Sequence, residues 1–133
     1  MAEGKVLTGA GLRGQVAGKT ALSTVGKSGA GLTYRGYDVQ DLAENCQFEE
    51  VAYLIFFGEL PTAEQLTAYK VKLKSLRQLP QALKEVLERI PADSHPMDVM
   101  RTGVSMLGNL ETEQSFAEQQ DVADRILATL PAI

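Results

Sequence analysis

The sequence contains few of the residues on which many kinds of binding site depend. It has no Trp, and aromatic residues make up 6% of its 133 residues, so broad stacking platforms for bases or sugars are not expected. Its single cysteine, Cys46, excludes an internal disulfide and favours a reducing compartment. With one histidine, His95, the chain has too few nitrogen and sulfur ligands for a closed zinc shell.

Long apolar runs and a surplus of positive charge are also missing. No run approaches the roughly 20 apolar residues that a membrane span needs, and the first residues lack the apolar segment of a signal peptide. The net charge of -4 argues against a nucleic acid as the main partner, because phosphate binding needs clustered Lys and Arg. We therefore expect a cytoplasmic protein that binds neither a membrane nor nucleic acid.

The charges and glycines divide the chain into two parts. Residues 1–40 hold five bases and two acids, whereas the remainder holds eight bases and fifteen acids. Residues 1–19 also carry five glycines, so we expect a flexible Gly-rich arm over 1–19 and one helical domain over 20–133. The arm is interpreted either as a solvated segment or as one that faces an anion or wraps a subunit.

Local patterns predict a short β-hairpin followed by six helices. Strands are expected at Thr20–Val25 and at residues 32–35, joined by a glycine-rich turn. Helices are expected to begin at or near the following residues: Asp38, Phe48, Thr62, Pro80, Pro96 and Ser115.

Several details of these helices can be predicted from single residues. Residues 48–57 are apolar nearly all round, which predicts a buried helix that ends at Gly58. Capping boxes are expected at Thr62–Gln65 and at Ser115–Glu118. The helix that begins at Pro96 is expected to stop at Gly108–Asn109.

Two phosphate-binding patterns occur without their structural context. Residues 9–14 match G-x-G-x-x-G, but neither a strand before it nor a helix after it is predicted. Gly18–Thr20 resembles the end of a P-loop, yet position 13 is Arg where that motif requires Gly, and a strand follows. We reject both as nucleotide sites.

The remaining candidates for chemistry are a thiol, an imidazole and two cationic positions. Cys46 is interpreted as a small buried residue and His95 as a helix-start residue bonded to nearby backbone, rather than as a nucleophile pair. Lys72 belongs to a cationic stretch that is either a solvated face or a dock for a carboxylate or phosphate. Arg35 either grips such an anion or ties Asp38 or the hairpin in place.

Longer runs of the chain resemble the citrate synthase family over nearly its whole length. Two motifs together are specific to this family: Tyr-Arg-Gly-Tyr at 34–37 and Gly-Glu-Leu-Pro-Thr at 58–62. The runs at 20–26 and 94–102, Thr-Ala-Leu-Ser-Thr-Val-Gly and Ser-His-Pro-Met-Asp-Val-Met-Arg-Thr, are most similar to the N-terminal part of the 2-methylcitrate synthase branch.

This resemblance implies a fold and an activity. The fold is mainly α, an orthogonal helical bundle that forms part of the large domain, with a short N-terminal β-hairpin. The activity is an acyl transfer in which propionyl-CoA or acetyl-CoA condenses with oxaloacetate to give 2-methylcitrate or citrate and CoA. The resemblance further implies a homodimer of propionate or tricarboxylic acid metabolism that needs no redox cofactor and no metal.

The same resemblance implies that the reactive residues lie outside these 133 residues. Family members use two histidines and one aspartate, and His95 stands in none of the catalytic motifs, so no catalytic residue is assigned. Arg35 is expected to support CoA phosphates and Lys72 to help at the substrate site. The chain ends in an apolar run at 130–133, which indicates a piece of a longer protein that is inactive alone. A stand-alone helical interaction or regulatory module is the alternative.

Overall fold

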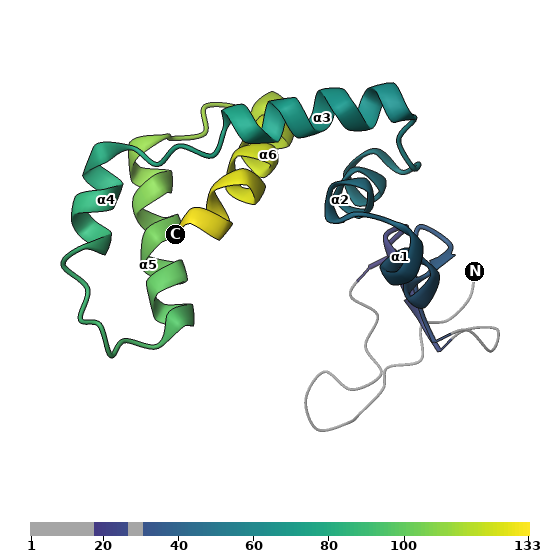
Figure 1. Ribbon diagram of the computed structural model, residues 1–133, viewed down its shortest axis with the longest axis horizontal. Helices are drawn as coiled ribbons and strands as arrows, with labels where there is room; N and C mark the ends of the chain where they lie inside the picture. Colours follow the sequence, from purple (N-terminus) through teal and green to yellow (C-terminus); the bar gives the residue numbers. More distant parts are fainter. Residues whose placement is uncertain (1–17, 27–30) are drawn as a thin grey trace, which may run out of the picture.

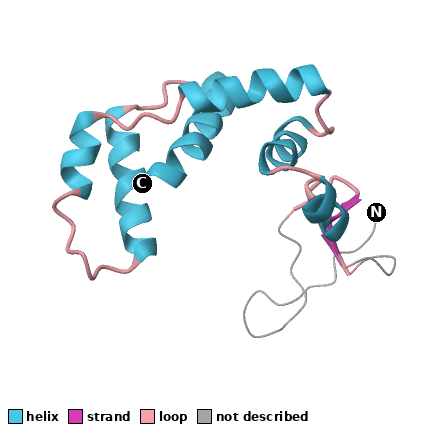
Figure 2. Cartoon of the chain, viewed as in Figure 1, coloured by secondary structure: helices cyan, strands magenta, loops and turns pink. Residues whose placement is uncertain are grey.

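The computed structural model describes residues 18–26 and 31–133, and the fold over them is mainly helical (Figures 1 and 2). This confirms the mainly α fold class. The expected arm at 1–19 lies almost wholly outside the described residues, as do the G-x-G-x-x-G run and most of the turn at 26–31.

A small antiparallel sheet stands at the start of the described chain. It has three strands in the order β1–β2–β3: β1 is Ser23–Val25, β2 is Leu32–Tyr34 and β3 is Tyr37–Asp38. Ser23 lies opposite Tyr34, and Tyr34 in turn lies opposite Tyr37. The predicted hairpin is therefore confirmed as β1–β2, and the short third strand is an addition that the sequence pattern did not predict.

Six α-helices follow the sheet. They are α1 Val39–Asn45, α2 Phe48–Phe57, α3 Ala63–Ser75, α4 Gln81–Leu87, α5 Pro96–Leu110 and α6 Gln119–Thr129. A short 3-10 turn, Phe116–Glu118, leads into α6, and a second, Leu130–Ala132, follows it.

The helix ends show which local signals decide the boundaries. Asp38 caps α1 by accepting a hydrogen bond from the Gln40 amide, and Thr62 and Gln65 form the predicted capping box of α3. Gly58 has φ 92° at the end of α2, a left-handed conformation that glycine adopts without a steric penalty.

Two predicted helix ends are wrong. Ser115 makes no side-chain capping hydrogen bond, and the Glu118 carboxylate accepts from the Gln114 amide at 2.9 Å rather than from the Ser115 amide. A 3-10 turn with Ser115 at its N-cap stands before α6. The helix α5 passes through Gly108 and Asn109 and ends at Leu110, because Asn109 bonds the Ser105 carbonyl from within the helix rather than ending it.

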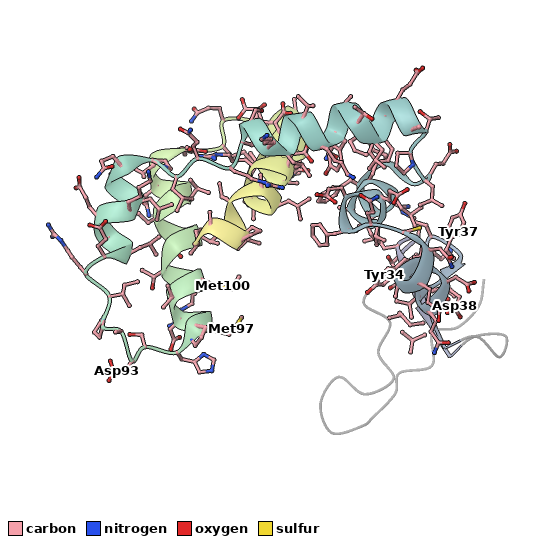
Figure 3. The ribbon with its side chains drawn as sticks, viewed as in Figure 1. Tyr34, Tyr37, Asp38, Asp93, Met97 and Met100 are labelled. Carbon is pink, nitrogen blue, oxygen red and sulfur yellow. The ribbon has the colours of Figure 1, made fainter. Side chains whose placement is uncertain are left out.

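The elements form an open arch rather than a closed bundle (Figure 1). The helices α4 and α5 pack together at one end, α3 runs along the top and contacts α6, which descends from it toward the C-terminus, and α1, α2 and the sheet lie at the other end. Figure 3 shows Tyr34 and Tyr37 at the sheet, far from Met97 and Met100 at the start of α5.

The buried core is correspondingly small. Tyr69, Leu73 and Ala128 form a cluster between α3 and α6, and α2 contributes Ala52 and Tyr53 to its edge. The Tyr69 ring stands edge-on to Tyr53, with a centroid separation of 5.4 Å, a favourable aromatic geometry.

The expectation of a fully buried α2 is wrong for the described residues. Only Leu54 is buried there, whereas Phe48 is 66% and Phe57 is 47% exposed. Among the described residues, α3 is the one element that packs extensively against α2. A helix that is apolar all round therefore keeps an uncovered face.

Candidate functional site

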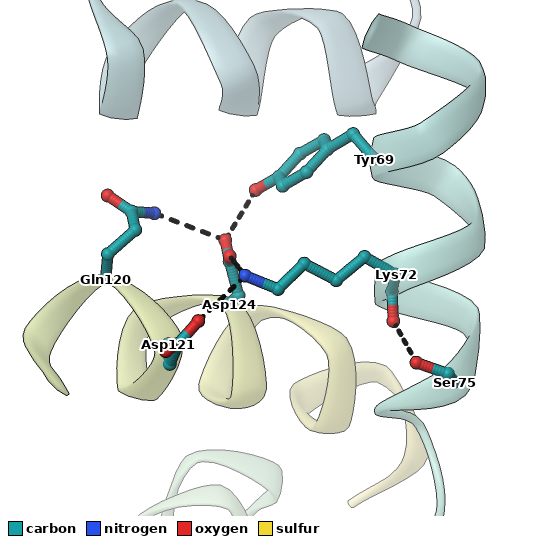
Figure 4. A network of polar contacts seen from close by, with 6 residues as sticks. All are labelled: Tyr69, Lys72, Ser75, Gln120, Asp121 and Asp124. Carbon is teal, nitrogen blue, oxygen red and sulfur yellow. Dashed lines mark hydrogen bonds and ion pairs between the residues drawn. The ribbon is translucent and has the colours of Figure 1, made fainter.

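A buried carboxylate joins α3 to α6. Asp124 on α6 is fully buried, and its Oδ1 accepts a hydrogen bond from the Tyr69 hydroxyl at 2.8 Å. Its Oδ2 lies 2.7 Å from Lys72 Nζ, which also reaches Asp121 Oδ1 at 2.9 Å. Gln120 Nε2 donates to Asp124 Oδ1 at 3.3 Å. We call these five residues the Asp124 cluster (Figure 4).

The surroundings of the Asp124 cluster keep its two titratable donors, Lys72 and Tyr69, protonated. Hydrogen bonds from Lys72 to Asp121 and Asp124 raise the pKa of the Lys72 ammonium. Burial, followed by the hydrogen bond to Asp124, raises the pKa of the Tyr69 hydroxyl. Lys72 therefore remains a cation and Tyr69 a neutral donor at ordinary pH. This pattern suits a structural ion pair, because neither group is poised to exchange a proton near neutrality.

This geometry bears directly on the prediction for Lys72. An ammonium has three donors, and two of them point at carboxylates of α6. The neighbouring cation Lys70 contacts Gln47 Oε1, at the start of α2. The cationic stretch of α3 is thus partly engaged by the fold, and the predicted ligand role of Lys72 stays a prediction.

Arg35 occupies the turn between β2 and β3. Both Arg35, with φ 50°, and Gly36, with φ 93°, have positive φ, as a type I′ hairpin turn requires. Arg35 Nη2 donates to the Ile55 carbonyl at 2.9 Å, one of the last carbonyls of α2. Its Nε is buried without a hydrogen-bond partner. The contact supports the interpretation that Arg35 ties the hairpin down, although it holds α2 rather than Asp38, and its CoA role stays a prediction.

Arg35 and Lys72 have no hydrogen-bond partner in common. The first fixes the β2–β3 turn to the end of α2, and the second fixes α3 to α6. The structure therefore gives each candidate its own structural contact rather than bringing them together.

Sequence reasoning missed Arg125, the most connected cation among the described residues. Its Nε and Nη2 bind the two oxygens of Glu111 at 2.8 and 2.6 Å, a bidentate pair. Its Nη1 donates to the carbonyls of Leu76 and Gln78, beyond the end of α3. Glu111 and Arg125 thus join the end of α5, α6 and the segment after α3. Hydrogen bonding to Arg125 lowers the pKa of Glu111.

A groove lies between α5 and α6, with a volume of about 510 Å³. We call it the α5–α6 groove. Its floor is apolar, and carboxylates and Arg125 lie around it. The residues that line it include Val104, Leu107, Val122, Ile126, Glu113 and Glu118.

The thiol and the imidazole have structural surroundings. His95 precedes α5, and its Nδ1 accepts a hydrogen bond from the Met97 amide at 3.2 Å, as predicted for a helix-start residue. Cys46 is only half-buried rather than buried. Desolvation, followed by the charge of Glu50, raises the pKa of its thiol, which disfavours the reactive thiolate.

The described part of the chain holds neither a cluster of metal ligands nor a helix of membrane-spanning character. Over residues 18–26 and 31–133, no group of three or more His, Cys, Asp and Glu side chains is arranged to hold a metal ion. Within the same ranges, no helix combines the length and the apolar character that crossing a membrane requires.

Comparison with known proteins relates the chain to one family. The family profile described as "Citrate synthase, C-terminal domain" matches residues 11–133. A 2-methylcitrate synthase of Shewanella oneidensis is 76% identical over 133 residues, which are 100% of this chain and 36% of that protein. The 2-methylcitrate synthase 2 of Corynebacterium glutamicum is 44% identical over 126 residues, covering 92% of this chain and 33% of that protein.

Solved structures agree with these sequence matches. The ternary complex of a Thermoplasma acidophilum citrate synthase with carboxymethyl coenzyme A and oxaloacetate is similar at a TM-score of 0.79 and 27% identity, over 89% of this chain and 32% of that one. A Thermotoga maritima citrate synthase also gives 0.79, at 29% identity, over 92% of this chain and 32% of that one.

The chain spans about a third of the length of these relatives. Because the family profile covers residues 11–133 and the similarity to the S. oneidensis protein extends over all 133 residues, the chain belongs to the citrate synthase family.

Proposed function

We propose that these residues are the N-terminal segment of an acyltransferase that condenses propionyl-CoA, or acetyl-CoA, with oxaloacetate to form 2-methylcitrate, or citrate, and CoA. The observation that carries the proposal is the 76% identity to a 2-methylcitrate synthase across all 133 residues. Identity of that extent includes the surface as well as the core. It therefore favours the same reaction rather than the same fold alone.

In this proposal the 133 residues act as a scaffold. The charged side chains that hold the helices together already form ion pairs with one another. Lys72 pairs with Asp124, and Arg125 pairs with Glu111. The reactive histidines and aspartate come from the remainder of the polypeptide. The proposed enzyme is a cytoplasmic homodimer of propionate metabolism that uses its CoA thioester as a substrate and needs no resident cofactor or metal.

A segment exchange tests the proposed reaction. In a chimera, these 133 residues replace the matching segment of the S. oneidensis 2-methylcitrate synthase. Propionyl-CoA and oxaloacetate are added, and free CoA is followed with a thiol reagent. We expect the chimera to turn over at a rate comparable to that of the parent enzyme, and the 133-residue chain alone to release no CoA.

Each outcome of this assay has a distinct meaning. Steady CoA release by the 133-residue chain alone would refute the scaffold role. A chimera that has the circular dichroism and melting temperature of the parent but no turnover contradicts the proposed reaction. Repeating the assay with acetyl-CoA ranks the two acyl substrates, for which one methylene is worth only ~1–3 kcal/mol.

The same chimera tests Arg35 and Lys72 as ligand supports. A CoA contact by Arg35 predicts that Arg35→Asn raises KM for propionyl-CoA, and a substrate-site role for Lys72 predicts that Lys72→Gln raises KM for oxaloacetate. Asp121→Asn is the control for Lys72, because it removes an exposed partner of that lysine and leaves the ammonium in place. Unchanged KM values for both variants would leave each residue with its structural contact only.

A further inference from the structure

The α5–α6 groove has a composition that points to a particular kind of occupant. Its floor is formed by aliphatic side chains from the two helices, of which Leu107 is buried and Val104, Val122 and Ile126 are half-buried. Two neighbours of lining residues in the sequence are also apolar and exposed: Leu110, next to Glu111, is 41% exposed, and Phe116, two residues before Glu118, is 86% exposed. A volume of about 510 Å³ accommodates several large apolar side chains.

The charges around the groove are mostly of one sign. Four carboxylates line it, from Glu111, Glu113, Glu118 and Asp121, against the single guanidinium of Arg125. Arg125 already uses four of its five N–H donors on Glu111 and on backbone carbonyls. Glu111 is paired with Arg125 and Asp121 with Lys72, so an incoming group meets the carboxylates of Glu113 and Glu118, which form no ion pair among the described residues. The groove favours apolar groups flanked by positive charge.

We propose that the α5–α6 groove seats an apolar segment bearing Lys or Arg, contributed by the part of the same polypeptide outside these 133 residues. This inference rests on the proposed function, under which the chain is about a third of a longer protein. The remaining two thirds supply a covalently linked partner at high effective concentration. Its Lys or Arg side chains meet the rim carboxylates, and its apolar side chains fill the floor.

A second copy of the same surface fits this groove less well. A two-fold interface places a patch against its own counterpart, so rim carboxylates would face rim carboxylates if the groove met itself. Like charges opposed across an interface are unfavourable, and the chain as a whole carries a net charge of -4. The charge pattern thus favours a basic segment over the identical face of another subunit.

Photo-crosslinking in the chimera tests the proposal. Benzoylphenylalanine replaces Thr112, an exposed residue that lines the groove. The control places the same crosslinker at Glu64, an exposed residue in the first turn of α3 and outside the groove. Mass spectrometry identifies the linked peptide, and gel mobility distinguishes a link within one chain from a link between two.

The expected result is a link within one chain, from position 112 to a peptide outside the 133 residues that carries Lys or Arg beside apolar residues. The Glu64 control is expected to give a different peptide or none. A link between two chains, a link to an acidic peptide, or no link from position 112 overturns the proposal. These readouts do not need turnover, so an inactive chimera can still support the inference, and an active one can still refute it.

Charge reversal at the rim sharpens the test. Glu113→Lys removes an exposed carboxylate and places a cation where a basic segment is proposed. We expect the yield of the within-chain link to fall about fivefold, the factor that ~1 kcal/mol gives at 25 °C. Glu64→Lys, with the same change of charge on α3, should leave the yield unchanged. An equal or higher yield for Glu113→Lys contradicts the proposed charge of the occupant.

Discussion

Two regions of the arch are held together in different ways. Where α3 meets α6, a fully buried carboxylate and the Arg125 guanidinium bond residues that lie 47 to 55 positions away in the sequence. At one end of the arch, the sheet and α2 are connected by Arg35 and the Ile55 carbonyl, only 20 positions apart. The first region depends on distant polar partners, and the second on local turns and caps.

This difference determines how each region should respond to substitution. Removing a buried carboxylate leaves its buried hydroxyl donor unsatisfied and breaks a hydrogen bond to a cation, which is strongly destabilising. The half-buried Arg35 donates one hydrogen bond to a neutral carbonyl, and the net loss of such a bond is modest. Substitutions at the α3–α6 pairing should therefore lower stability strongly, and substitutions at the β2–β3 turn should lower it little.

Removing the buried carboxylate should have the largest effect. Asp124→Ala leaves the Tyr69 hydroxyl without its acceptor and Lys72 with Asp121 alone. The unsatisfied hydroxyl costs about 1–3 kcal/mol and the lost hydrogen bond from Lys72 about 1.5–3 kcal/mol, so we expect the free energy of unfolding, measured by urea denaturation, to fall by about 3–5 kcal/mol. Asp121→Ala is the matched control, because that carboxylate is 78% exposed and should cost less than about 1 kcal/mol. Equal losses for the two variants would show that burial does not govern this pairing.

A conservative change at Arg125 comes next. Arg125→Lys keeps the charge but cannot hold both Glu111 oxygens and two carbonyls at once. The expected loss is about 2 kcal/mol in the same assay, the sum of two net hydrogen bonds to charged or buried groups. Arg101→Lys, at a side chain that is 77% exposed and pairs with Asp98, should change little. Matching losses would mean that the fork geometry of Arg125 is unimportant.

Helix ends and strand positions could largely be predicted from the sequence, because short-range contacts determine them. Asp38 and the Thr62–Gln65 pair bond backbone amides two or three residues away, and Gly58 needs only its own φ. The Ser115 box failed: the Glu118 carboxylate bonds the amide of Gln114 instead of that of Ser115, and the Ser115 side chain makes no capping bond. Sequence spacing thus predicts which residues can cap a helix, but it does not always predict which capping bond forms.

The candidate site was harder to predict, because it depends on which helices meet. Lys72 was selected as a cation, but its partners Asp121 and Asp124 lie about fifty positions later. A signal did exist: Asp124 shares a helical face with Leu127 and Ala128, so an acid stood on the apolar side of the last helix. Such an acid must find a partner when buried. The sequence does not show that the partners are Tyr69 and Lys72.

Acid should weaken the α3–α6 region through Glu111. Its pKa is lowered in the folded state by Arg125, so its stabilising contribution is complete above the unfolded value of about 4.3 and is lost as pH falls through the folded pKa. Because the Glu111 side chain is 39% exposed, the effect should be smaller than that of Arg125→Lys. The unchanged chain should melt at a higher temperature than Glu111→Gln from pH 7 down to about pH 5. Between about pH 5 and pH 3, this difference in melting temperature should shrink. A constant difference across this range would contradict the assignment.

The smallest effect is expected at the β2–β3 turn, where two contributions oppose each other. Arg35→Asn introduces a residue that tolerates positive φ, which relieves roughly 1 kcal/mol, and loses the hydrogen bond to Ile55, worth about 1 kcal/mol. The net change in unfolding free energy should lie within about 0.5 kcal/mol. Arg35→Lys keeps the unfavourable φ and loses the guanidinium N–H that reaches the Ile55 carbonyl, so it should cost more than the less conservative change to Asn. The opposite order would mean that the positive charge of Arg35, rather than its guanidinium contact and turn geometry, holds the hairpin against α2.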